Sequence, residues 1–140
     1  MTVAELAERL GVGDAGIRSE IDLLDAVSRG LPTVAVDAAV HSGILSADEA
    51  DRLVIARRTL AARKARGQDL TRDESDRLMR VARVNAVSLE QFGSAEKAGR
   101  WLRKPNRALG GRVPLELLAT GEGARVVEET IMRIAHGLFI

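Results

Sequence analysis

TRDESDRLMRVARVNAVSLEQFG, residues 71–93, is the stretch that decides how this chain folds. It opens on a capping box, in which the Thr71 hydroxyl accepts a hydrogen bond from an unpaired backbone N–H and the Glu74 side chain reaches back to the cap. Apolar residues then recur at the spacing of one helical face. The stretch therefore predicts a long helix over residues 72–91, and the chain is expected to divide near it.

The same helix signals recur on both sides of this stretch. Capping boxes begin at Thr2 and Ser46, and glycines such as Gly43 and Gly67 stand where left-handed C-terminal caps are expected. No segment shows the convincing alternation of a strand. We therefore predict an all-α fold. The expected helices span residues 3–10, 17–29, 34–42, 47–54, 57–66, 72–91, 95–103, 114–119 and 123–136.

Aliphatic side chains have to build the core of this chain. Tyrosine is absent and there are only two phenylalanines and one tryptophan, so Leu, Val, Ile and Ala must fill it, which suits helices better than sheets. Near the N-terminus, Ile17, Ile21, Leu24 and Val27 follow the i, i+4, i+7 pattern of an amphipathic helix. Trp101 is expected to anchor the core of the C-terminal half.

Length and composition exclude several classes of protein. A chain of 140 residues can form one domain or two small helical ones. Without cysteine it can form neither disulfides nor thiolate metal sites. Its apolar runs are too short to span a bilayer, and no signal peptide opens it. We therefore expect a protein of the reducing cytoplasm with no membrane partner.

Charge is distributed unevenly along the chain, although the net charge is only +1. Residues 1–56 carry four basic and ten acidic side chains, whereas residues 57–83 carry nine basic and four acidic ones. Residues 84–140 carry eight basic and six acidic side chains. The basic middle segment is therefore the part of the chain to consider for an anionic partner.

Residues 46–66 have the pattern of a helix-turn-helix. Ser46 caps its first helix, Ala50 offers a small side chain where two helices approach, and Leu60 faces inward from the second helix. That second helix carries five cations and no anion over residues 57–66. A recognition helix needs cations for phosphates and polar side chains for base edges. The candidate DNA-binding residues are Arg57, Arg58, Thr59, Arg63, Lys64 and Arg66.

The basic helix also has a second interpretation. It can be a solvated face that pairs with the acidic N-terminal third of the chain, and the residues alone do not separate this interpretation from DNA binding. The turn raises a further question, because the position that most often holds glycine is Val54. Valine resists the left-handed conformation, so we expect a turn that is longer or differently shaped.

The second half of the chain carries a series of motifs in a fixed order. They are Trp101-Leu102, Pro105-Asn106, Leu109-Gly-Gly111, Pro114-Leu115, Leu117-Leu118 and Thr120-Gly121. This series resembles the toxin-binding domain of the Xre/MbcA/ParS-type antitoxins, which neutralise RES-domain toxins. Upstream, Gly30-Leu-Pro32, Arg58-Thr-Leu60 and Glu74-Ser-Asp-Arg-Leu78 resemble the Xre-type region of the same family. The resemblance covers about residues 30–140.

Most residues of the series have structural explanations of their own. Gly110-Gly111 permits backbone angles that other residues avoid, which fits a tight reversal between helices. Pro114 is expected to start the next helix at its first position. The motifs therefore identify a scaffold more than a set of contacts.

The resemblance implies a fold in three parts and two partners. Residues 1–30 would be an N-terminal helical extension, 31–91 an Xre-like helix-turn-helix region, and 92–140 a small helical toxin-binding domain with a C-terminal tail. The implied partners are a cognate RES-domain toxin that degrades NAD and operator DNA. Because symmetric dimers bind paired half-sites, a homodimer is expected.

The C-terminal tail is the segment that the resemblance assigns to the toxin. In such antitoxins the last residues obstruct the NAD pocket of the toxin. Chain ends are usually polar, whereas this one has three large apolar side chains, each worth about 1.5–3 kcal/mol when buried. The alternative is packing against the domain itself or a dimer mate. The candidate toxin-binding residues are Arg133, His136, Gly137, Leu138, Phe139 and Ile140.

No catalytic or metal-binding motif is evident in the sequence. His41 and His136 lie far apart, and neither has a carboxylate at ligand spacing. The acidic run Asp48-Glu49-Ala-Asp51 is typical of a helix start, which the helix dipole favours. Gly110-Gly111 lacks the following Lys-Ser/Thr of a phosphate-binding loop. We expect a binding protein without metal or cofactor rather than an enzyme.

Three hypotheses follow for function. The leading one is an antitoxin that occludes the active site of its toxin with the tail and represses its own operon. The second is a stand-alone helix-turn-helix transcriptional regulator whose C-terminal half serves dimerisation or senses a ligand. The third is a structural adaptor that never binds DNA.

Overall fold

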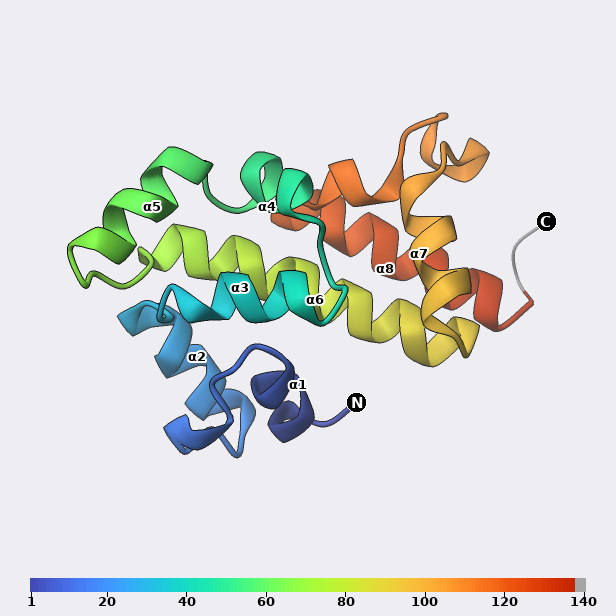
Figure 1. The fold of residues 1–140 in the computed structure, drawn as a ribbon. Coiled ribbons are helices and arrows are strands. Elements are labelled where there is room, and N and C mark those ends of the chain that lie inside the picture. Colours follow the sequence, from blue (N-terminus) through green and yellow to red (C-terminus); the bar gives the residue numbers. More distant parts are fainter. Residues whose placement is uncertain (138–140) are drawn as a thin grey trace. The chain divides into compact units, whose positions relative to one another are not determined.

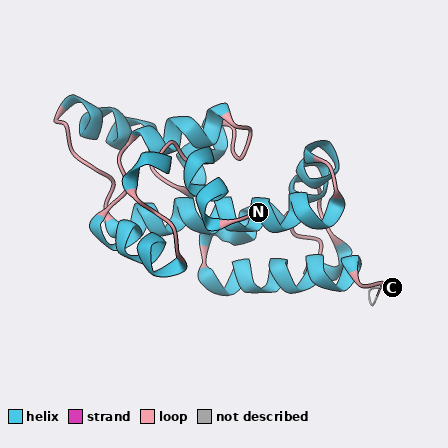
Figure 2. Cartoon of the chain, turned by 90° about the horizontal axis from the view of Figure 1, so that it is seen from below, coloured by secondary structure: helices cyan, strands magenta, loops and turns pink. Residues whose placement is uncertain are grey.

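The computed structural model describes residues 1–137 of the chain, and every regular element in that range is helical (Figure 2). An isolated antiparallel bridge between Asn106 and Arg112 is the one β pairing among these residues. The prediction of an all-α fold is therefore confirmed. The α-helices are α1 (Val3–Arg9), α2 (Glu20–Arg29), α3 (Val34–His41), α4 (Ala47–Leu53), α5 (Arg57–Ala65), α6 (Arg72–Phe92), α7 (Ala95–Arg103) and α8 (Gly121–Ala135), and the 3₁₀ helices are η1 (Gly13–Ala15), η2 (Arg107–Leu109) and η3 (Pro114–Ala119) (Figure 1).

Three of the predicted helices differ from the observed ones in type or by more than one residue, and the others match to within one residue. α2 begins at Glu20 rather than residue 17, because Ser19 and Asp22 form the capping box that starts it. The segment 114–119 is a 3₁₀ helix rather than an α-helix. α8 begins two residues earlier than expected, because the Thr120 hydroxyl accepts the backbone N–H of Gly123 at 3.0 Å. Local capping side chains explain both shifted starts.

The chain forms two compact units, Met1–Ala82 and Arg83–Ile140. We call them the N-terminal unit and the C-terminal unit, and α6 contributes residues to both. The first contains α1 to α5, and the second contains α7, α8 and the two 3₁₀ helices between them. The expected helix-turn-helix therefore lies wholly within the N-terminal unit.

The N-terminal unit is built around the first half of α6. Leu78, Val81 and Ala82 of that helix are at most 1% exposed. The hydroxyl of buried Ser75 accepts the backbone N–H of Leu31 at 2.8 Å, which holds the loop before α3 against α6. A buried polar side chain with a partner costs little free energy, and here it joins segments distant in sequence. Further fully buried side chains of this unit are Leu10, Leu23, Ile44, Leu45 and Val54.

The amphipathic pattern near the N-terminus is only partly buried. Ile17 is 5% exposed, but Ile21 and Leu24 of α2 are 65% and 61% exposed. The residues of α2 that enter the core are Leu23 and Ala26 instead. The spacing correctly indicated a helix. It did not indicate the buried face, since that depends on which elements pack against α2.

The C-terminal unit packs η3 against α7 and α8. The largest fully buried side chains here are Leu102, Leu115, Leu118 and Ile131. Trp101, which was expected to anchor this core, is half-buried and lies against Phe92 with 5.5 Å between the ring centroids. The expected reversal at Gly110-Gly111 is present, with φ values of +68° and +81°. Aliphatic side chains thus fill the interior of this unit, and the aromatic pair lies at its edge.

At Gly123, α8 lies close against the backbone of η3. A Cβ atom at this position would lie 1.8 Å from the backbone oxygen of Leu117, which cannot move aside as a flexible side chain can. We expect Gly123→Ala to lower the free energy of unfolding by about 2–3 kcal/mol or more, measured by urea unfolding followed by circular dichroism. Gly121→Ala is the matched control, because a Cβ there meets nothing within 4 Å. Equal stability of the two variants would contradict this account.

Candidate functional site

The helix-turn-helix consists of α4, a short turn and α5. Ser46 and Glu49 form the predicted capping box of α4: the Ser46 hydroxyl accepts the Glu49 N–H at 3.1 Å, and the Ser46 N–H donates to Glu49 Oε1 at 2.8 Å. In the turn, the N–H groups of Val54 and Ile55 both donate to the carbonyl of Ala50 at 3.0 Å. All three of these residues are buried. The turn is therefore anchored by both backbone hydrogen bonds and packing.

Val54 avoids the left-handed conformation. Its φ and ψ are −119° and −64°, and no residue other than glycine has a positive φ within residues 1–137. The turn therefore differs in shape from one that needs glycine, as expected. The Val54 carbonyl accepts a hydrogen bond from Arg77 Nε of α6 at 3.0 Å. Both the N–H and the carbonyl of Val54 thus have hydrogen-bond partners, and its φ stays negative.

Asp51 caps the N-terminus of α5 from the preceding helix. Ala56 occupies the N-cap position and has no side chain that can accept a hydrogen bond. Asp51 Oδ1 accepts the backbone N–H of Arg57 at 2.8 Å in its place. A carboxylate at this position also interacts favourably with the helix dipole. The sequence indicated Asp51 only as part of a helix start, not as the cap of the next helix.

α5 lies on the surface of the N-terminal unit and contains no buried residue. Arg58 and the C-cap residue Arg66, which we count among the five cations of α5, are exposed and form no ion pair within the described residues. Thr59 and Leu60 are half-buried. Two cations of α5 are thus fully available to an outside partner.

The other three cations of α5 are paired with carboxylates. Arg57 pairs with Asp48, and Lys64 Nζ lies 2.8 Å from Asp37 Oδ1. Both carboxylates belong to the acidic N-terminal third, so the second interpretation of the basic helix describes these two residues correctly. All four side chains are at least 41% exposed, so these pairs contribute little to stability and can exchange partners.

Arg63 has a different environment, because it joins α5 to α6 through Glu74. Arg63 Nη2 donates to Glu74 Oε2 at 3.1 Å, Nη1 contacts the other oxygen, and Glu74 also accepts the Thr71 N–H at 2.8 Å. The two side chains are only 20% and 10% exposed. Burial raises the pKa of Glu74, but the hydrogen bonds from Arg63 and Thr71 outweigh it, so the pKa falls below its ordinary value of 4.5.

The lowered pKa of Glu74 predicts a pH dependence of stability. Its contribution is fully present above pH 4.5 and is lost as the pH falls from there through the lower pKa of the folded state. Glu74→Gln leaves Arg63 without its charged partner, so we expect a loss of about 2 kcal/mol at neutral pH. The loss should shrink on acidification, measured by urea unfolding at stepped pH.

Asp73→Asn is the control for this prediction. Asp73 is exposed in the same first turn of α6 and forms no ion pair in the described part of the chain. Its loss should change stability by only about 0.3–1 kcal/mol, through the helix dipole. If the stability of the Glu74→Gln variant falls with acidification as much as that of the parent chain, the loss of stability in acid is due to other carboxyl groups.

The exposed end of α8 is the second candidate site. The helix ends at Ala135, the N–H groups of His136 and Gly137 donate to the carbonyls of Met132 and Ile134, and Gly137 has a φ of +68°. The helix stop predicted at Gly137 is thus observed. Arg133, His136 and Gly137 are exposed. The other predicted toxin-binding residues, Leu138, Phe139 and Ile140, lie outside the described residues.

Metal ligands and membrane-spanning helices are not found among the described residues. In that part of the chain, no three His, Cys, Asp or Glu side chains gather as metal ligands would. None of the helices described has the length and apolar character needed to cross a membrane.

Besides Asp51, three carboxylates contact α5 through its cations, and none of the three was identified individually from the sequence. They are Asp37, Asp48 and Glu74. No local signal could have revealed them, because each pairs with a cation at least nine residues away.

The fold and its surfaces define an all-helical protein with a helix-turn-helix unit and a second small unit, and comparison with known families agrees. Residues 22–83 match the antitoxin Xre-like helix-turn-helix domain, and residues 89–137 match the antitoxin Xre/MbcA/ParS C-terminal toxin-binding domain. Together these matches cover most of the chain.

Individual relatives carry related names. An antitoxin Xre of Pseudomonas putida is 37% identical over 121 residues, which is 86% of this chain and 76% of that protein. An antitoxin Xre of Yersinia enterocolitica is 32% identical over 84% of this chain and 80% of its own length. A Prs ADP-ribosylating antitoxin of a Sphingobium species is 28% identical, over 86% and 82%. The chain belongs to the Xre/MbcA/ParS antitoxin family.

Proposed function

We propose that this chain neutralises a cognate RES-type, NAD-degrading toxin by placing its C-terminal tail in the toxin's active site. The C-terminal unit matches a toxin-binding domain, and α8 ends in an exposed turn directly before the apolar tail. One relative is named an ADP-ribosylating antitoxin, and ADP-ribosylation consumes NAD. The proposed toxin-binding residues are Arg133, His136, Gly137, Leu138, Phe139 and Ile140.

We further propose that the chain represses its own operon as a homodimer through α5. The observation that carries this proposal is a surface helix with five cations, held by a glycine-free turn in a helix-turn-helix domain. Arg58 and Arg66 are available to contact DNA phosphates directly. Arg57 and Lys64 contact phosphates once these displace Asp48 and Asp37. Thr59 is a further DNA contact on the same helix. Arg63 takes part mainly by fixing the position of α5.

Both proposals describe a binding protein of the cytoplasm rather than an enzyme. They are tested by co-expressing the chain with the protein encoded beside its own gene, and by following growth, cellular NAD and co-purification. Binding of the purified chain to the DNA upstream of its gene is measured in parallel. Rescue with a stable complex is the expected result. DNA binding without rescue would favour the stand-alone transcriptional regulator, and rescue without DNA binding would remove the autoregulatory role.

A further inference from the structure

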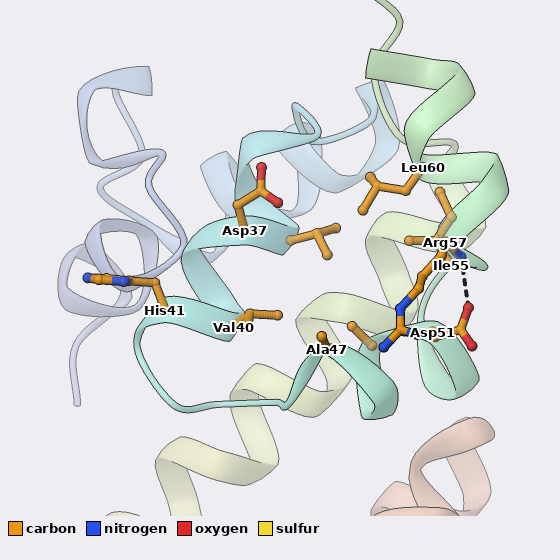
Figure 3. A pocket seen from close by; sticks show the side chains of 10 residues that line it. Asp37, Val40, His41, Ala47, Asp51, Ile55, Arg57 and Leu60 are labelled. Carbon is orange, nitrogen blue, oxygen red and sulfur yellow. Dashed lines mark hydrogen bonds between the residues drawn. The ribbon is translucent and has the colours of Figure 1, made fainter. Parts of the chain in front are cut away.

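A cavity of about 390 Å³ lies between α3, α4 and α5 in the N-terminal unit. Small-molecule pockets have volumes of about 300–1,000 Å³, apolar walls and a few polar groups. Figure 3 shows Val40, Ile55 and Leu60 around this space, with Asp37 on one side and Asp51 and Arg57 on another. Arg57 and Leu60, in the first turns of α5, line the cavity. Neither the toxin nor operator DNA explains why it is there.

The walls of the cavity are mostly apolar. Val36, Ala50 and Ile55 are each at most 5% exposed and form the inner surface, and Val40 and Leu60 are half-buried at its sides. The backbone that carries Ala50 and Ile55 is fixed, because the Ile55 N–H donates to the Ala50 carbonyl in the α4–α5 turn. Such a space favours a compact aliphatic or aromatic group, which water would otherwise have to surround.

The rim of the cavity is acidic. Its lining includes two carboxylates, Asp37 and Asp51, against one cation, Arg57, together with the imidazole of His41. Asp37 Oδ1 binds Lys64 and Asp51 Oδ1 accepts the Arg57 N–H, but the Oδ2 atoms of both carboxylates have no hydrogen-bond partner within residues 1–137. A carboxylate can accept several hydrogen bonds. The rim therefore offers two negatively charged carboxylate oxygens that can each accept a hydrogen bond from a ligand.

We propose that this cavity binds a small organic cation. The apolar body of the ligand lies between Val40, Ile55 and Leu60, and its ammonium group donates to the free oxygen of Asp37 or Asp51. An anionic ligand of the same shape is disfavoured, because the two carboxylates of the lining outnumber its single arginine. This inference does not depend on either the toxin or the operator.

The test uses three probes of similar shape with the full chain: 2-phenylethylammonium, neutral 2-phenylethanol and anionic phenylacetate. Methyl resonances of Val36, Val40, Ile55 and Leu60 are followed by NMR during titration. The ammonium probe should give saturable shifts confined to these methyl groups. It should bind about tenfold or more tightly than the alcohol, because a charge-assisted hydrogen bond contributes about 1.5–3 kcal/mol. Phenylacetate should give no saturable shift.

Variants assign the charge preference to the rim. Asp37→Asn and Asp51→Asn keep an acceptor oxygen but remove the charge, so together they should bring the ammonium and alcohol affinities to within about twofold, as the charge assistance is lost. Asp25→Asn, an exposed residue of α2 that does not line the cavity, should leave the preference intact. Chemical shift changes that do not saturate, that spread over the surface, or that are equal for all three probes would overturn the proposal. If a variant fails to fold, the three titrations of the parent chain are sufficient to decide between these outcomes.

Discussion

Removal of Leu138, Phe139 and Ile140 is expected to abolish neutralisation of the toxin. Each large apolar side chain contributes about 1.5–3 kcal/mol when it is buried. Losing three of them should weaken the complex by about a thousandfold or more, since each tenfold corresponds to about 1.4 kcal/mol. Cells that co-express the toxin with the shortened chain should stop growing and lose NAD. Affinity is measured by calorimetry with a catalytically inactive toxin.

The control for this deletion removes apolar surface elsewhere. Ile21 and Leu24 are exposed on α2 of the N-terminal unit, so replacing both with Ala removes comparable surface without touching the tail. This variant should neutralise the toxin fully. If the shortened chain still rescues growth, the tail does not block the active site. If instead its melting temperature falls, the tail packs against its own domain or a dimer mate.

Replacing Arg58 and Arg66 with Ala is expected to have the second largest effect, on operator binding. Both side chains are exposed cations of α5 without an intramolecular ion pair in the described range. The slope of log affinity against log salt concentration should fall by about 0.9 for each phosphate that the variant no longer neutralises. The binding free energy should weaken by about 1–3 kcal/mol for each base that the variant no longer recognises. Fluorescence anisotropy with the DNA upstream of the operon, at several salt concentrations, measures both.

Arg107→Ala with Arg112→Ala is the matched control, because it removes the same charge from exposed positions of the C-terminal unit. Affinity and salt slope should stay close to those of the parent chain. Equal weakening by both double variants would mean that net charge, not α5, holds the DNA. Arg63→Ala should behave differently from either, by lowering the free energy of unfolding, because it leaves the carboxylate of Glu74 unpaired.

Much of the fold could be predicted from the sequence because its helix starts are encoded locally. Ser46 with Glu49, and Thr71 with Glu74, carry their capping geometry within four residues, and the structure reproduces both. The buried face of α2 could not be predicted in the same way. Ile21 and Leu24 have the correct helical spacing, but no local rule states which elements will pack against them.

The candidate site was predicted less completely than the fold. Five cations in ten residues identified α5, but the sequence did not separate the cations that pair internally from those that do not. The Lys64–Asp37 pair joins residues 27 positions apart, and the Arg63–Glu74 pair joins residues 11 positions apart. These pairs form only when α3 and α6 pack beside α5. The assignment of the tail to the toxin came from the family resemblance and stays a prediction.

The cations of α5 differ in whether they support the fold, and this difference affects how the sequence can evolve. Arg63 is tied to Glu74, so mutation at that position is selected against through folding, whatever DNA is bound. Arg58 and Arg66 support no buried contact and can be exchanged without loss of the scaffold. If α5 reads the operator as we propose, operator preference can therefore change through Arg58 and Arg66 without a change of fold. Related antitoxins can thus separate their regulation in a few substitutions while they keep one fold.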